Sequence, residues 1–238
     1  MTGNRCGHNP GLPRTFEVPA GHRSRPKLLI VLGDAVMDYY AHPEKTLPSL
    51  NAANHSDRRQ RSERREACLL LLRAVIHYTD LISLEVGVPR ADGSIGSLTL
   101  ERLSTLTQLG ARRTARAMKD LKTAGILNVK ARCRRTADGN FRGEAAIKSL
   151  SPHVFAIFGL DRWLGHEQRR AAERKQRSRQ KSDRKSRAQF RLVADALLNL
   201  AGRATPKVSL ERTQRANLEF EKIRKSLGIG LSACSVEN

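Results

Sequence analysis

The chain has 238 residues, enough for one large domain or two small ones, and its 44 Lys and Arg against 23 Asp and Glu give a formal charge of +21. This excess predicts a polyanionic partner. Nucleic acid is favoured over a membrane because no stretch reaches the roughly 18 apolar residues that a span needs. The first 25 residues lack the apolar core of a secretory signal, and the four cysteines show neither disulfide nor zinc spacing. We therefore expect a protein of a reducing cytoplasm with no membrane partner.

The N-terminal third is predicted to be an arm, a helix, a linker and a second helix. Residues 1–25 have few large apolar side chains and predict a disordered arm. A helix, or a short strand followed by a helix, is expected within 26–41, and a linker over 42–54. Residues from 56 or 57 to about 79 predict a long helix, basic in its first half. Its second half is apolar nearly all round, so we expect burial on more than one side.

Residues 98–149 predict a helix-turn-helix followed by a basic β-hairpin, the pattern of a winged helix. Before it, the alternation over 81–86 predicts a short strand and 87–97 a loop. Thr99 can cap the first helix and Gly110 can form the turn. A C-terminal Gly125 suits the end of the second helix.

The return of the predicted hairpin is expected at Asp138-Gly139, a dipeptide typical of a type I′ turn. The fold class is therefore mainly α with a small antiparallel β-hairpin (α+β), a winged helix-turn-helix with helical extensions. Residues 26–160 are expected to form the DNA-binding domain, 161–188 a basic helical segment and 189–238 C-terminal helices. The last amphipathic helix is a candidate interface, which leaves a homodimer open.

The second helix of the pair is the candidate recognition helix. Spacings of four, three and four put Arg112, Arg116, Lys119 and Thr123 on one face. The opposite, packing face is expected to be Ala111, Ala115, Met118 and Leu121. Arginines in the first half of such a helix suit guanine edges, because their planar fork matches two acceptors. The candidate DNA-contacting residues of this helix are Arg112, Arg113, Thr114, Arg116, Lys119 and Thr123.

Two further basic groups are candidates for contact with the DNA backbone or the minor groove. The hairpin carries Arg132, Arg134, Arg135 and Arg142 around its tip, where a wing meets a duplex. The basic run after it, represented by Arg174, Lys175 and Arg177, would bind phosphates without sequence preference. The alternatives are a solvated helix face, an edge hairpin protected by charge, and a charged linker helix.

The sequence offers no catalytic machinery. It lacks a Gly-rich phosphate loop and a run of paired carboxylates on a strand. Tyr39-Tyr40 resembles the tyrosine pair of a rolling-circle nickase. The seven histidines of the chain, however, are too far apart in the sequence to form the metal-binding motif that such an enzyme needs. We expect no catalytic residues, no cofactor and no metal. Trp163, the one tryptophan, is expected to be a packing anchor.

The arrangement resembles the RepA replication initiators of IncFII-type plasmids. The resemblance rests on RRQRSERREACLLLLRAVIHYTDL with its His77-Tyr78 pair, on the Thr-, Arg- and Ala-rich helix over 112–117, and on LKTAGILNVKARCRR with Gly125-Ile126-Leu127. It covers residues 26–190 and does not extend over the last fifty.

The resemblance implies a plasmid replication initiation protein that binds the double-stranded DNA of the plasmid origin. It further implies that host replication factors, an initiator and a helicase, are recruited there. The alternative is a winged-helix transcriptional regulator that binds an operator through the same recognition helix. A basic RNA-binding protein is disfavoured, because such proteins stack exposed aromatic side chains on bases and only 4% of the residues in this chain are aromatic.

Overall fold

The computed structural model describes residues 8–20, 25–56, 58–90, 92–202 and 210–226. The described chain is mainly helical and has two small antiparallel β-hairpins, as the α+β prediction requires. It divides into two compact units, Met1–Lys175 and Gln176–Asn238.

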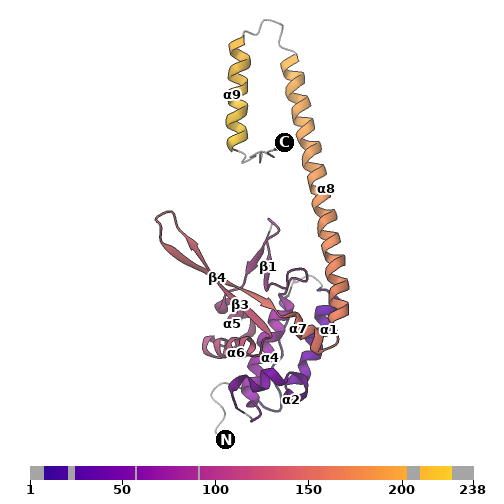
Figure 1. Ribbon diagram of the computed structural model, residues 1–238, viewed down its shortest axis with the longest axis vertical. Coiled ribbons are helices and arrows are strands. Elements are labelled where there is room, and N and C mark those ends of the chain that lie inside the picture. The colour runs from indigo at the N-terminus through magenta and orange to yellow at the C-terminus, as the bar shows by residue number, and fades with distance from the viewer. Residues whose placement is uncertain (1–7, 21–24, 57, 91, 203–209, 227–238) are drawn as a thin grey trace, which may run out of the picture. The chain divides into compact units, whose positions relative to one another are not determined.

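Helix α4 (Ser62–His77) is the centre of the first unit (Figure 1). It contacts α1 (Lys27–Ala35), the 3-10 helix η1 (Val36–Tyr39), α5 (Leu100–Thr107) and α6 (Ala111–Thr123). Eleven of its 16 residues are buried, among them the run Leu69–Leu72. Each buried leucine contributes about 1.5–3 kcal/mol. The predicted burial of this helix on more than one side is confirmed.

Helix α4 begins later than the sequence predicts, at Ser62 rather than at residue 56 or 57. Gln60 is the physical reason. Its backbone N–H donates to Asn51 Oδ1 at 3.0 Å, and its Nε2 donates to Leu50 O at 2.8 Å. The Tyr39 hydroxyl donates to its Oε1 at 3.1 Å. These tertiary hydrogen bonds hold the segment before Ser62 outside the helix.

The predicted disordered arm is wrong for residues 8–20. This segment has no regular structure, but His8 and Phe16 are buried, and Phe16 belongs to the hydrophobic core. The predicted linker over 42–54 likewise forms short helical turns. They are α2 (Pro43–Thr46), α3 (Pro48–Asn51) and η2 (Ala52–Asn54), and each α-helical turn begins with a proline, which suits the first helical position.

The segment predicted as a strand over 81–86 begins with a turn, and only Glu85 and Val86 form isolated antiparallel bridges, to Ser149 and Thr79. The predicted loop contains the strands of the first hairpin. The Asp80 carboxylate accepts from the backbone N–H groups of Ile82 and Ser83, and Leu84 has φ +57°. Short-range side-chain bonding of this kind competes with strand pairing. The first hairpin follows as β1 (Gly87–Pro89) and β2 (Ile95–Ser97).

Helices α5 and α6 are consecutive and joined by a tight turn. Thr99 caps α5 as predicted, with its Oγ1 accepting from Arg102 N at 3.1 Å. Gly110 precedes α6 with φ +58°, and Gly125 follows it with φ +71°. Glycine tolerates these positive φ values without strain, so both predicted glycine roles are confirmed.

The second hairpin pairs β3 (Leu127–Arg135) with β4 (Phe141–Leu150) in antiparallel register. Its distal half projects from the helical body (Figure 1). The hairpin is as predicted, but its turn is not type I′. Thr136 N–H donates to Asn140 O at 2.7 Å, and Gly139 has a positive φ whereas Asp138 does not. A type I′ turn would need a positive φ at both residues.

Three helices follow the second hairpin: α7 (Pro152–Ile157), α8 (Asp161–Gly202) and α9 (Leu210–Ser226). At the start of α8, Leu164 is buried and Trp163 packs against the core, which confirms Trp163 as a packing residue. Helix α8 continues past the predicted end of the basic segment at residue 188 and crosses the division between the two units. None of the helices in the described ranges is long and apolar enough to span a bilayer.

Candidate nucleic-acid interface

Helix α6 has an exposed basic face and a buried face. Arg112, Arg116, Lys119 and Thr123 are all exposed, as their spacing predicts. Within the described residues, the side chains of the three cations have no hydrogen bond or ion pair. Four unpaired side chains on one face of a helix, three of them cationic, can all approach the same groove of a duplex.

The buried face of α6 matches the predicted one in part, since Leu121 is buried and Met118 packs against the core as predicted. Ala117, Leu121 and Thr114 are buried, whereas Ala111 and Ala115 are exposed. Thr114 was predicted to contact DNA, but it is fully buried, so this prediction is wrong. Its Oγ1 donates to Gly110 O at 3.0 Å, which satisfies the hydroxyl inside the protein.

Arg113 was also predicted to contact DNA, and the structure turns it inward. Its Nη2 donates to Glu63 O at 3.3 Å and to Glu66 Oε2 at 3.4 Å. Its side chain is only 19% exposed. Arg113 therefore ties α6 to α4 and is not available as a base-reading side chain.

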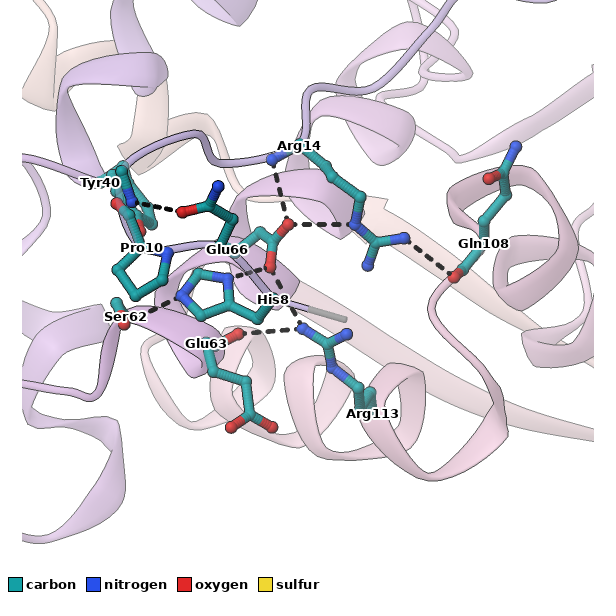
Figure 2. Close-up of polar contacts among 11 residues, drawn as sticks. His8, Pro10, Arg14, Tyr40, Ser62, Glu63, Glu66, Gln108 and Arg113 are labelled. Atoms are coloured by element: carbon teal, nitrogen blue, oxygen red, sulfur yellow. Dashed lines mark hydrogen bonds and ion pairs between the residues drawn. The ribbon is translucent and has the colours of Figure 1, made fainter. Parts of the chain in front are cut away.

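Glu66 is the centre of a polar cluster that joins the N-terminal segment, α4 and α6 (Figure 2). His8 Nδ1 lies 2.5 Å from Glu66 Oε2, and Arg14 donates to Oε1 from its backbone N and its Nε at 3.0 and 3.1 Å. Arg14 also reaches Gln108 O in the α5–α6 turn at 3.4 Å. Burial alone would raise the pKa of Glu66, but the hydrogen bonds from Arg14 and His8 hold it below its ordinary value.

A second buried acid fixes the other flank of α6. Arg64 donates to Asp120 through Nε at 2.7 Å and through Nη2 at 2.6 Å, a bidentate pair between α4 and α6. The hydrogen bond to Asp120 raises the pKa of Arg64. Burial, and then the charge of Asp120, raise the pKa of the neighbouring Cys68 thiol. Two charged contacts, at Arg113 and Asp120, thus hold α6 on α4.

Sequence reasoning did not single out Glu66 or Asp120. The available signal was an acid beside an apolar stretch: Glu66 directly precedes Ala67 and Cys68, and Asp120 precedes Leu121. An acid that must be buried requires a cationic partner. Periodicity cannot identify that partner when, as for His8 and Glu66, it lies 58 residues away in the sequence.

The distal half of the β3–β4 hairpin carries the predicted wing arginines, and all are exposed: Arg132, Arg134, Arg135 and Arg142. The register opposes Arg132 to Glu144, and Arg134 to Arg142. Since opposed residues share a face, these three arginines lie on one side of the hairpin with Glu144. Arg135 lies on the other side, opposite Phe141, which is 75% exposed. Glu144 Oε2 is 3.2 Å from Arg132 and Oε1 is 4.0 Å from Arg134.

One basic residue of the hairpin, Lys148, is buried near its base. Lys148 Nζ donates to Leu98 O at 2.6 Å and to Ala146 O at 3.1 Å. Burial lowers its pKa. Lys148 therefore joins the hairpin to Leu98, just before the Thr99 cap of α5, and is not available to DNA.

The candidate phosphate-binding residues of α8 are exposed in both units. Arg174 and Lys175 end the first unit, and Arg177 belongs to the second. No group of three or more potential metal ligands occurs among the residues that the structure describes.

Comparison with protein-family models, curated protein sequences and solved structures found no match to this chain.

Proposed function

We propose that this chain is a DNA-binding protein that reads duplex sequence through the exposed face of α6. The observation that carries the proposal is that α6 exposes an unpaired basic face while the helix itself is held in place from beneath. Arg112, Arg116 and Lys119 are exposed and have no partner among the described residues, while Arg113 and Asp120 hold the same helix against α4. A rigid helix that presents arginine forks suits the acceptor pattern of the major groove.

The β3–β4 hairpin acts as a wing in this proposal, which makes the molecule a winged helix-turn-helix protein. The order α5, α6, β3, β4 is that of a winged helix, and the distal hairpin carries four exposed arginines. Such side chains contact phosphates or enter the narrow minor groove beside the recognition helix. The exposed cations of α8 add affinity that does not depend on sequence.

The biological role that we propose is initiation of plasmid replication in the bacterial cytoplasm. It rests on the resemblance of residues 26–190 to RepA initiators, which also implies a host initiator and helicase as partners. The formal charge of +21 supports a role in which one protein holds an extended length of DNA. No catalytic step and no cofactor belong to the proposal.

A replicon assay tests the role. The gene with its flanking DNA is joined to a selectable marker on a circle that lacks any other origin, and transformants are counted. Initiation predicts stable transformants that disappear in an Arg112→Ala/Arg116→Ala variant expressed at the same level. A protein that binds the flanking DNA but yields no transformants would instead be a transcriptional regulator.

A further inference from the structure

A basic hollow lies beside the recognition face, between the segment around the start of α4 and helix α6. It has a volume of about 420 Å³ and one acid, Glu63, in its lining. Its cationic lining consists of Arg58, Arg59, Arg61, Arg64, Arg113 and Arg116. At roughly 30 Å³ for each water, it holds on the order of ten waters, which is more room than a single phosphate needs.

Three of these six arginines are committed to contacts inside the protein. Arg64 is paired with Asp120, and Arg113 with Glu63 O and Glu66. The Arg59 guanidinium donates to Ala41 O. These contacts orient the three guanidinium groups, which form the fixed wall of the hollow.

The remaining three arginines have donors to spare. Arg58, Arg61 and Arg116 are exposed, and their side chains make no hydrogen bond or ion pair within the described ranges. The lining of the hollow carries six arginines and one acid, Glu63, so positive charge predominates in it.

The backbone that presents Arg58 and Arg61 is held in place. Gln60, between them, is buried and bonded to Tyr39, Asn51 and Leu50. The backbone beside this anchor is therefore fixed before any ligand arrives. Preorganisation of this kind lowers the cost of binding.

We propose that the hollow binds a phosphate group of the DNA strand that borders the groove entered by α6. Arg116 belongs both to the hollow and to the exposed face of α6, so the two surfaces are continuous. A phosphodiester offers two acceptor oxygens, which match the guanidinium forks of Arg58 and Arg61. This inference rests on the proposed function. It adds a contact that fixes how the duplex is seated on α6.

The test compares the full chain with an Arg58→Gln/Arg61→Gln variant on random and on preferred duplexes, over about 50 to 200 mM salt. The variant should bind both duplexes more weakly by the same factor, and the slope of log K against log salt should fall by about 1 for one lost phosphate. Arg58→Lys/Arg61→Lys keeps the charge without the fork and should lie between the variant and the wild type.

Lys27→Gln/Lys45→Gln removes two exposed positive charges from α1 and α2 and is the matched control. An Arg58→Gln/Arg61→Gln variant that binds no worse than this control, while Arg116→Ala still weakens binding, overturns the phosphate site and leaves the proposed function standing. If none of the α6 or hollow variants weakens duplex binding, both the phosphate site and the proposed function are overturned.

Inorganic tripolyphosphate distinguishes a DNA strand from a free polyanion as the source of the phosphate. If tripolyphosphate raises the Tm of the wild type but not of Arg58→Gln/Arg61→Gln, and the two bind DNA equally, the hollow is a small-polyanion site and the DNA proposal is wrong. Weaker DNA binding by the variant, at unchanged Tm without ligand, supports the strand contact.

Discussion

Helix α6 and the distal β3–β4 hairpin are both strongly basic, but their charges are held in different ways. In α6 the inward charges are locked, Arg113 to Glu66 and Asp120 to Arg64, and the outward cations have no partner in the described structure. In the hairpin all four arginines are exposed, and Glu144 alone neutralises part of one face.

Under the proposed function, this difference separates a surface that reads the base sequence from a surface that contacts the phosphate backbone. Base readout requires a side chain to be held within a fraction of an ångström, which the buried contacts under α6 can supply. Phosphate contact tolerates mobility because the backbone repeats along the strand and carries no sequence information. We therefore expect changes under α6 to cost stability, changes on its outer face to cost specificity, and changes in the hairpin to alter only general affinity.

The largest effect is expected at Glu66, beneath the reading surface. Glu66→Gln leaves the side chains of His8, Arg14 and Arg113 without their carboxylate and should lower the free energy of unfolding by about 3 kcal/mol. Urea unfolding followed by circular dichroism measures it. The exposed Glu17→Gln control should change stability by less than about 0.5 kcal/mol. A loss at Glu66 as small as that of the control would mean that the cluster does not hold α6.

The same carboxylate predicts a pH dependence. The folded-state pKa of Glu66 lies below the ordinary value of 4.5, so its contribution is present above pH 4.5 and is lost as the pH falls through the folded-state value. The stability gap between wild type and Glu66→Gln should therefore be constant near neutrality and shrink in acid. Unfolding free energies over a pH series give the gap. A gap that widens in acid would reverse the assigned sign.

An intermediate effect is expected on the outer face of α6, where neighbouring arginines have opposite roles. Arg116→Ala should cost about 1–3 kcal/mol on the preferred duplex and leave the unfolding free energy unchanged within about 0.5 kcal/mol. Arg113→Ala should lower stability and weaken binding to all duplexes alike. Fluorescence anisotropy with preferred and random duplexes compares them. Equal losses on both duplexes for Arg116→Ala would make it a phosphate contact.

The smallest effect is expected in the hairpin. Arg134→Gln/Arg142→Gln removes two opposed cations from one face and should reduce the salt slope by about 1 for each phosphate lost, with no change in sequence preference. Binding at several salt concentrations supplies the slope. A change in which sequences are preferred would transfer part of the reading role to the wing.

How much could be predicted from sequence follows from the range of the interactions. Helical periodicity predicts the exposure of Arg112, Arg116, Lys119 and Thr123. Local chemistry predicts the cap at Thr99 and the glycine turns, because the first needs a side-chain acceptor and the second a positive φ. The same reasoning assigned Ala111 and Ala115 to the buried face because they are apolar. The face that is buried in the structure is centred on Ala117 and Leu121.

Two of the misplaced parts, Arg113 and the N-terminal segment, depend on long-range partners, whereas the partner of Thr114 is local. Arg113 turns inward because it pairs with Glu66, which lies 47 residues earlier in the sequence. The N-terminal segment is ordered because His8 and Arg14 contact the same carboxylate. Thr114 is tolerated inside because its hydroxyl bonds to the helix backbone. None of these contacts leaves a periodic trace in the sequence.

Selection from a random-sequence duplex library tests the central claim most directly, with wild type, Arg116→Ala and Arg134→Gln/Arg142→Gln run side by side. The account predicts one enriched motif for the wild type, the same motif with one relaxed position for Arg116→Ala, and an unchanged motif for the hairpin variant. Absence of any enriched motif in the wild type, or a motif that Arg116→Ala leaves intact while the hairpin variant alters it, would contradict the claim that α6 reads the sequence.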